Sequence, residues 1–166
     1  MSEANKRQDV PRWLDDEEMR AWRGLVETFS DVVADLDADL QREHGLTHGD
    51  YGVLVHLSEA EGDRLRMCDL AERLHLSPSG LTRRIDGLVR AAMVRREQAP
   101  DDRRVILAVL TPEGRRRIEE AAPDHVESVR RRLFDHLSRT QIKELGATLA
   151  ALRAGRGDDE TVRPAS

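Results

Sequence analysis

The middle of the chain, residues 67–110, changes its hydrophobic periodicity in a way that few folds can accommodate. A short helical pattern ends at a tight turn, His75-Leu76, and Ser77-Pro78 then restarts a helix with a capping serine and a proline at the first helical position. Beyond Ala92 the pattern becomes extended, and two strands, 93–97 and 105–110, flank turn residues 99–102. A helix, a turn, a helix and a hairpin in this order predict a winged helix-turn-helix.

Helical patterns flank this middle segment on both sides. One runs from about residue 13 to residue 43, which is longer than helices of small globular domains, and Gly45 ends it. A second follows over 47–61, and Arg64-Leu65-Arg66 is a short extended candidate. Thr111-Pro112 begins another helix, which Pro123 is expected to kink, and the last opens at Ser138. The expected fold is mainly α, with six helices and a small β wing.

The outer helices carry apolar stripes that one small winged domain cannot cover. We therefore expect residues 13–46 and 112–153 to form a helical dimerisation region, and residues 47–111 to form the winged domain. A monomer that hides these stripes internally is the alternative. Residues 1–12 and 154–166 lack periodicity and are expected to be flexible tails.

The chain is expected to be cytoplasmic and away from membranes. No apolar run approaches the roughly 20 residues of a membrane span. The first twelve residues are polar and have no apolar signal core. The single cysteine, Cys68, excludes an internal disulfide and a cysteine-rich metal cluster.

Charge is unevenly distributed along the chain, which has a net charge of −5. Residues 1–65 hold 7 basic and 16 acidic side chains, whereas residues 66–104 hold 9 basic and 6 acidic ones. The basic middle segment would attract an anionic polymer, and the acidic first segment would repel it.

The helix that begins after Ser77 has one apolar and one polar face. Its expected buried stripe is Leu81, Ile85, Leu88 and Val89. Small residues in its first turn let the helix approach a nucleic-acid groove closely, and Arg83 is long enough to reach a guanine edge. An ordinary solvated helix face is the alternative interpretation.

Four arginines surround the predicted hairpin loop: Arg95, Arg96, Arg103 and Arg104. An arginine at a hairpin tip suits a narrow minor groove, where negative potential is concentrated. The alternative is a charged edge that discourages strand pairing. A basic wing directly after a helix-turn-helix favours binding to duplex DNA.

Residues 67–114 resemble the multiple-antibiotic-resistance regulator (MarR) family of winged-helix repressors. The resemblance rests on MCDLAERLHLSPSGLTRRIDGLVRAAMVRRE and DDRRVILAVLTPEGRR, and the flanking helices extend it to about residues 13–153. It implies a homodimer, with the wing arginine Arg104 in the minor groove and Asp102 orienting it. The residues that it implies for DNA contact are Ser77, Ser79, Gly80, Thr82, Arg83, Arg84, Asp102, Arg103 and Arg104. Ala92 departs from the family, which usually has glycine there.

The family often binds small aromatic acids or phenols between the dimer helices and the winged domain. The candidate residues for such an effector site are Trp22, His44, His48 and Tyr51, for which core packing is the alternative role. Some relatives sense oxidants, but Cys68 has no second cysteine to resolve it. Zinc-responsive relatives need clustered ligands, whereas the six histidines here are dispersed, so we expect neither a metal nor a cofactor.

The sequence thus predicts a ligand-responsive transcriptional regulator, a repressor, that binds palindromic duplex DNA as a homodimer. Helix 78–91 is expected in the major groove and wing 95–105 in the minor groove. No nucleophile elbow, phosphate-cradling glycine loop or HExxH motif is found, so the chain is not expected to be an enzyme. The alternatives are a winged protein-interaction module and a redox-responsive regulator that uses Cys68.

Overall fold

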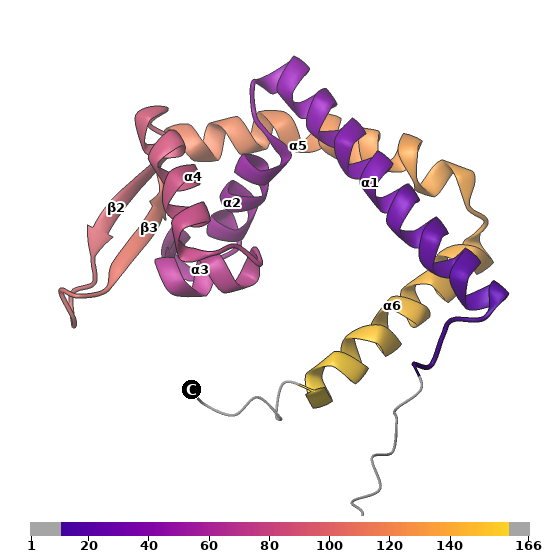
Figure 1. Ribbon diagram of the computed structural model, residues 1–166. Coiled ribbons are helices and arrows are strands. Elements are labelled where there is room, and N and C mark those ends of the chain that lie inside the picture. The colour runs from indigo at the N-terminus through magenta and orange to yellow at the C-terminus, as the bar shows by residue number, and fades with distance from the viewer. Residues whose placement is uncertain (1–10, 160–166) are drawn as a thin grey trace, which may run out of the picture.

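The structure, a computed structural model, describes residues 11–159, with side chains to residue 155 (Figure 1). Within this range lie six α-helices, three strands and two single-turn 3-10 helices. The α-helices are α1 (Asp16–His44), α2 (His48–Ser58), α3 (Met67–Arg73), α4 (Pro78–Arg90), α5 (Pro112–Arg132) and α6 (Arg139–Asp159). The strands are β1 (Arg64–Arg66), β2 (Val94–Gln98) and β3 (Ile106–Leu110), and the 3-10 turns are η1 (Glu61–Asp63) and η2 (Phe134–His136). The expected mainly helical fold with a small β wing is confirmed.

Two expectations about the ends of the chain need comment. Helix α6 continues to Asp159, so residues 154–159 are helical and are not part of a tail. Residues 1–10 and 160–166, expected to be flexible and free of a signal core, lie outside the described residues. None of the described helices is long and apolar enough to cross a membrane.

Helix boundaries follow the capping residues in the sequence. Ser77 caps α4 by accepting a hydrogen bond from the Gly80 N–H at 3.1 Å, and Pro78 occupies the first turn. Thr111 caps α5 in the same manner. Gly45 ends α1 in the left-handed conformation, with φ of 64°.

The wing is a three-stranded antiparallel sheet in the order β1-β3-β2. Leu65 of β1 and Arg96 of β2 both face Ala108 of β3, so the short extended segment before α3 is the third strand. One face of this sheet joins a core built with α2, α3 and α4, whose most deeply buried members include Leu54, Leu70, Leu81, Ile85 and Val94. Val89, expected in this core, is instead 37% exposed.

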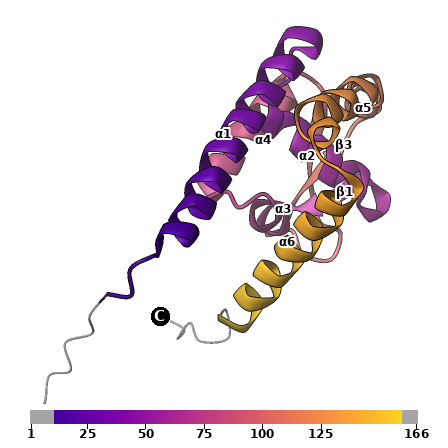
Figure 2. The same ribbon diagram turned by 90° about the vertical axis from the view of Figure 1, so that its right-hand side faces the viewer.

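Helices α1 and α5 extend together from the winged domain, and α6 turns back from the far end of α5 (Figures 1 and 2). A buried carboxylate holds α1 to α5. Asp39 of α1 accepts hydrogen bonds from Arg132 of α5, at 3.0 Å from Nε and 2.7 Å from Nη2, and from the Ser128 hydroxyl. These donors hold the pKa of Asp39 well below its usual range, so the ion pair persists at neutral pH.

Helices α1, α5 and α6 together form an arm. The half of this arm that lies away from the winged domain leaves large apolar side chains in solvent. They are Trp13, Leu14, Trp22, Leu25, Val26 and Phe29 in α1 and just before it, with Leu149 and Leu152 in α6. An exposed apolar surface of this extent usually marks an interface.

Ala92 supplies a direct test of the turn between α4 and β2. It has φ of 57°, a left-handed conformation that costs an L-residue with a Cβ about 1–2 kcal/mol. Ala92→Gly removes this strain but adds backbone freedom to the unfolded chain, so it should raise the free energy of unfolding by a net amount of about 0.5–1 kcal/mol, measured by urea denaturation.

Its neighbour is the matched control. Ala91 has φ of −81°, which any residue adopts. Ala91→Gly should lower the free energy of unfolding by about 0.5–1 kcal/mol, because it only adds backbone freedom to the unfolded chain. Equal effects of the two substitutions would contradict the observed turn.

Candidate nucleic-acid interface

Helix α4 presents a polar face to solvent. Ser79, Thr82 and Arg83 are all exposed on it. The Thr82 hydroxyl donates to the Pro78 carbonyl at 2.8 Å, and Ser77 is occupied by the helix cap. Arg83 is therefore a long cation that the N-terminal half of this face offers to a partner.

The wing presents Arg103 and Arg104, both exposed. Asp102 accepts a hydrogen bond from the backbone N–H of Arg104 at 2.9 Å, so it braces the main chain of the loop rather than the guanidinium. Arg104 and Thr82 line the same groove, which has a volume of about 590 Å³ and lies between the wing and helices α3 and α4.

Arg96 joins the wing to α4. It donates to Asp86 at 2.7 Å and to the Thr82 carbonyl at 3.3 Å. Arg96 lies among the loop arginines in the sequence, and no local spacing rule connects it to Asp86, ten residues away. Arg95 is likewise paired, with Glu97 at 2.6 Å. Two of the four hairpin arginines are thus held by carboxylates, whereas Arg103 and Arg104, at the loop, have no carboxylate partner among the described residues.

Arg84 is half-buried and points toward α2, unlike its neighbour Arg83. Its Nη1 donates to Thr47 Oγ1 at 3.1 Å and to Asp50 Oδ1 at 3.3 Å. The two arginines are consecutive and differ by about 100° around the helix. Arg84 was predicted to contact DNA, but in the structure its guanidinium pairs with Thr47 and Asp50 instead of extending from the exposed face.

Three of the four candidate effector residues gather at the junction of α1, α2 and α5. Tyr51 is buried with its ring centroid 4.4 Å from that of His125, which in turn lies 5.8 Å from His48. His44 lies nearby at the end of α1. His125 was missed in the sequence because its place beside Tyr51 depends on the packing of α5.

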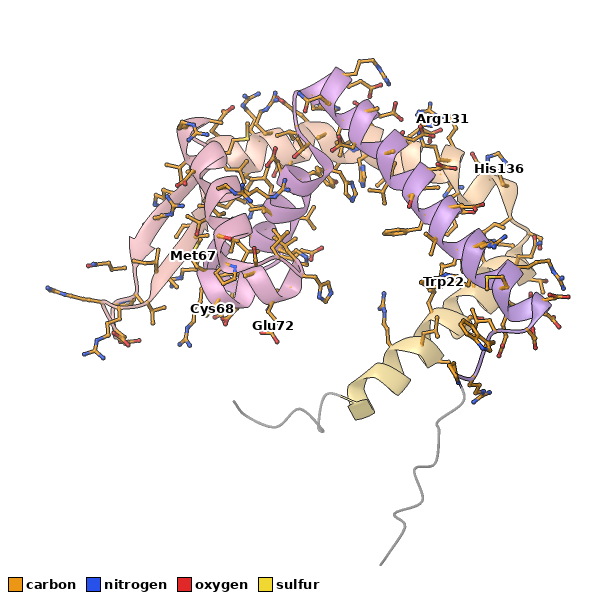
Figure 3. All side chains as sticks on the ribbon, viewed as in Figure 1. Trp22, Met67, Cys68, Glu72, Arg131 and His136 are labelled. Atoms are coloured by element: carbon orange, nitrogen blue, oxygen red, sulfur yellow. The ribbon has the colours of Figure 1, made fainter. Side chains whose placement is uncertain are left out.

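Trp22 does not join this group. It is 55% exposed and lies on α1 at the end away from the winged domain (Figure 3). The 22 residues between it and His44 span about 33 Å of helix. Trp22 and Tyr51 therefore do not line one crevice within a single chain.

Buried histidine nitrogens mark this junction. The Nδ1 atoms of His48 and His125 are buried and have no hydrogen-bond partner among the described residues. Burial, with a smaller contribution from nearby His48, lowers the pKa of His125, so this ring is neutral at pH 7. Burial likewise raises the pKa of the Tyr51 hydroxyl.

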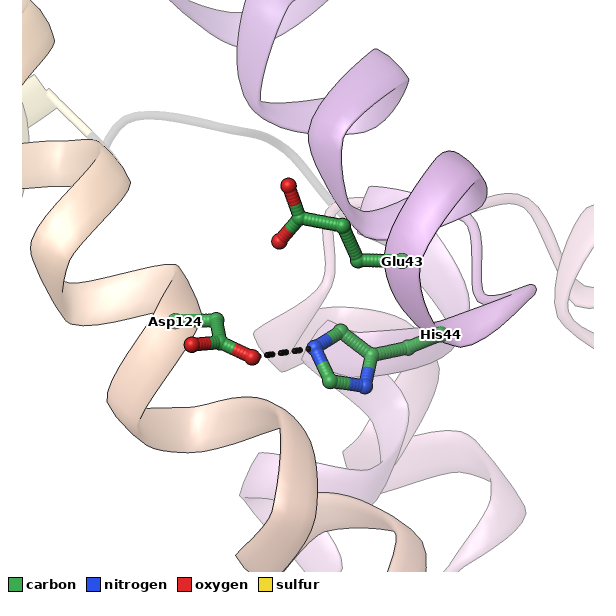
Figure 4. A group of neighbouring side chains, drawn as sticks. All are labelled: Glu43, His44 and Asp124. Atoms are coloured by element: carbon green, nitrogen blue, oxygen red, sulfur yellow. Dashed lines mark hydrogen bonds and ion pairs between the residues drawn. The ribbon is translucent and has the colours of Figure 1, made fainter.

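Glu43, His44 and Asp124 form a small cluster beside this junction (Figure 4). One potential ligand atom from each lies within 4.8 Å of the others. His44 Nε2 is already hydrogen-bonded to Asp124 at 3.0 Å, and Glu43 is paired with Arg42 at 2.7 Å. These contacts account for the cluster as a link between α1 and α5.

Cys68 is exposed at the start of α3 (Figure 3). Its thiol donates to Asp69 at 3.3 Å, and it lines the same groove as Arg104. The structure thus places the thiol beside the candidate interface and away from the histidine junction.

Comparisons with known proteins agree with this geometry. A family model described as MarR family matches residues 44–105. The chain is similar to Sco3205, a MarR family transcriptional regulator from Streptomyces coelicolor solved in complex with DNA, with 39% identity and a TM-score of 0.83 over 89% of this chain and 92% of that one. It is also similar to CouR from Rhodococcus jostii RHA1 bound to p-coumaroyl-CoA, with 28% identity and a TM-score of 0.66 over 77% of this chain and 87% of that one.

Among curated proteins, the chain is 34% identical over 85 residues to the HTH-type transcriptional repressor YetL of Bacillus subtilis. That match spans 51% of this chain and 51% of the relative, about half the length of each. The similarity to Sco3205, by contrast, extends over nearly the whole of both chains, so it includes both the winged domain and the helical arm. The chain belongs to the MarR family of transcriptional regulators.

Proposed function

We propose that this chain binds duplex DNA as a homodimer, with α4 in the major groove and the wing in the adjacent minor groove. The observation that carries the proposal is the common groove lined by Thr82 of α4 and Arg104 of the wing. Exposed Arg83 and Arg104 extend from the two elements that border this groove, in the basic segment of an otherwise acidic chain. The relative Sco3205 was solved with DNA, which supports this assignment.

The exposed apolar face of the arm is assigned to a second copy of the chain. Phe29 is 67% and Trp22 is 55% exposed, and both lie on the part of α1 that extends beyond the winged domain. If this face packed against the same face of a second copy about a two-fold axis, the apolar side chains of both copies would be buried. Two recognition helices about 34 Å apart would then match successive major grooves of a palindromic site. Residues 13–46 and 112–153 are the dimerisation region in this proposal, and residues 47–111 are the DNA-binding domain.

We propose repression as the regulatory outcome. A dimer that covers two successive major grooves excludes other proteins from that stretch of duplex. The relative YetL is a repressor, which favours this outcome over activation.

A small aromatic or phenolic anion is the proposed effector. The unpartnered Nδ1 atoms of His48 and His125 and the buried Tyr51 ring provide polar and stacking groups where the arm meets the winged domain. The relative CouR was solved with p-coumaroyl-CoA, which supports an aromatic acyl group as the ligand class. A ligand that prefers a different angle between arm and winged domain lowers DNA affinity by its difference in affinity for the two states.

Arg83→Ala and Arg104→Ala test the interface. Arg83→Ala should weaken binding to a selected duplex by about 1–3 kcal/mol and relax base preference at one position in each half-site. Arg104→Ala should weaken binding and remove preference for A·T-rich flanks, because the narrow minor groove is no longer occupied. Fluorescence anisotropy with labelled duplexes measures both effects.

Arg12→Ala is the matched control, since it removes the same charge from an exposed position just before α1, outside both the dimerisation region and the DNA-binding domain. It should bind like the parent. If Arg83→Ala and Arg104→Ala also bind like the parent, the interface is elsewhere, and a protein-interaction role for the winged domain is favoured.

The effector proposal predicts that salicylate or hydroxycinnamate lowers DNA affinity about tenfold, within the usual range of allosteric coupling. His48→Leu should abolish the response without changing DNA affinity in the absence of ligand. Cys68→Ser should respond like the parent. Release of DNA by peroxide that is lost in Cys68→Ser, with no response to any aromatic acid, would replace the effector with redox control.

A further inference from the structure

The side chain of Arg84 links helix α4 to the N-terminus of α2. Its Nη1 atom lies 3.1 Å from Thr47 Oγ1 and 3.3 Å from Asp50 Oδ1. The side chains of Arg84 and Asp50 are 29% and 26% exposed, so solvent screens this ion pair less than it screens a surface pair. The Nε atom of Arg84 is buried as well.

The site that receives Arg84 is shaped by Gly49. A Cβ added at Gly49 would overlap the guanidinium of Arg84, so only glycine leaves room for the group in this position. The contact is therefore built from both sides, by an arginine on α4 and by a glycine on α2.

The same turn of α2 is tied to the arm. Thr47 and Asp50 form the capping box of α2, with the Thr47 hydroxyl donating to Asp50 Oδ2 at 2.6 Å. The backbone N–H of His48, between them, donates to Asp37 Oδ1 of α1 at 2.6 Å. Arg84 is thus two contacts away from the helix that carries the proposed dimer face.

We infer that Arg84 is a positioning residue that fixes the orientation of the recognition helix relative to the dimer arm, and that it does not contact DNA. The inference rests on the proposed function. In a dimer, a small change in the angle between α4 and α1 changes the separation of the two recognition helices. Binding to a duplex with two half-sites depends on that separation, whereas binding to a single half-site does not.

Comparing the affinities for these two duplexes therefore distinguishes a positioning residue from a DNA contact. Arg84→Met removes the donors and keeps the length of the side chain. Gly49→Ala displaces the guanidinium while leaving every exposed side chain of α4 unchanged. Both variants should bind a two-half-site duplex about tenfold more weakly than the parent, a loss typical of a coupling residue. Both should bind a single-half-site duplex like the parent.

Salt dependence separates positioning from contact. Loss of a phosphate contact lowers the slope of log affinity against log salt concentration by about 1, and a positioning residue leaves it unchanged. Arg84→Met and Gly49→Ala should both keep the parent slope. The double variant should bind like either single variant, because both remove the same interaction. Thermal unfolding followed by circular dichroism confirms that each variant is folded at the assay temperature.

Two results would overturn the inference. One is a loss of single-half-site binding and a shallower salt slope in Arg84→Met while Gly49→Ala binds like the parent, which would make Arg84 a DNA contact. The other is parent-like two-half-site binding by both folded variants. Failure of the proposed function is distinguishable from both, because the parent chain itself would then bind no duplex selectively.

Discussion

The pairing of the buried Asp39 carboxylate with Arg132 and Ser128 is the interaction on which the arrangement of the arm and the winged domain depends. Asp39 lies on α1 and its two partners lie on α5, so the pairing joins the first helix to the one that follows the wing. Other polar contacts of α1, such as His44 with Asp124 and Asp37 with the His48 N–H, act together with it, but the Asp39 carboxylate is the buried one. Removing one partner of a buried pair leaves an uncompensated charge, so this contact is costly to break and holds α1 in one direction relative to α5. The proposed separation of two recognition helices is a consequence of this rigidity.

Two further ion pairs between an arginine and a carboxylate link the elements that lie between the arm and the proposed interface. Arg84 fastens α4 to α2, and Arg96 fastens the wing to α4 through Asp86. In each ion pair the arginine is at least partly covered. The arginines assigned to DNA, Arg83 and Arg104, are exposed and have no carboxylate partner among the described residues. The same residue type therefore holds elements together where a carboxylate pairs with it and is available for recognition where none does.

The capping signals explain why the order of elements could be predicted from the sequence. Ser77-Pro78 and Thr111-Pro112 act locally, and the structure starts helices at both. The left-handed φ of Ala92 likewise agrees with the preference for glycine at that turn. The roles of neighbouring side chains could not be predicted in the same way. Helical spacing places Arg84 nearer the core boundary than Arg83, but its pairing with Thr47, 37 residues away, depends on how α2 packs against α4. His125 and Trp22 show the same limit, because contacts between distant helices decide their surroundings.

A rigid arm, the proposed two-fold dimer and a basic winged domain together predict that the chain reads two half-sites at a fixed separation. Selection of bound duplexes from a random pool, followed by footprinting, tests this claim most directly. The account predicts enrichment of inverted repeats whose centres are about one helical turn apart, with affinity lost when about half a turn is inserted between them. Enrichment of single half-sites, or affinity that is independent of the inserted length, would contradict it.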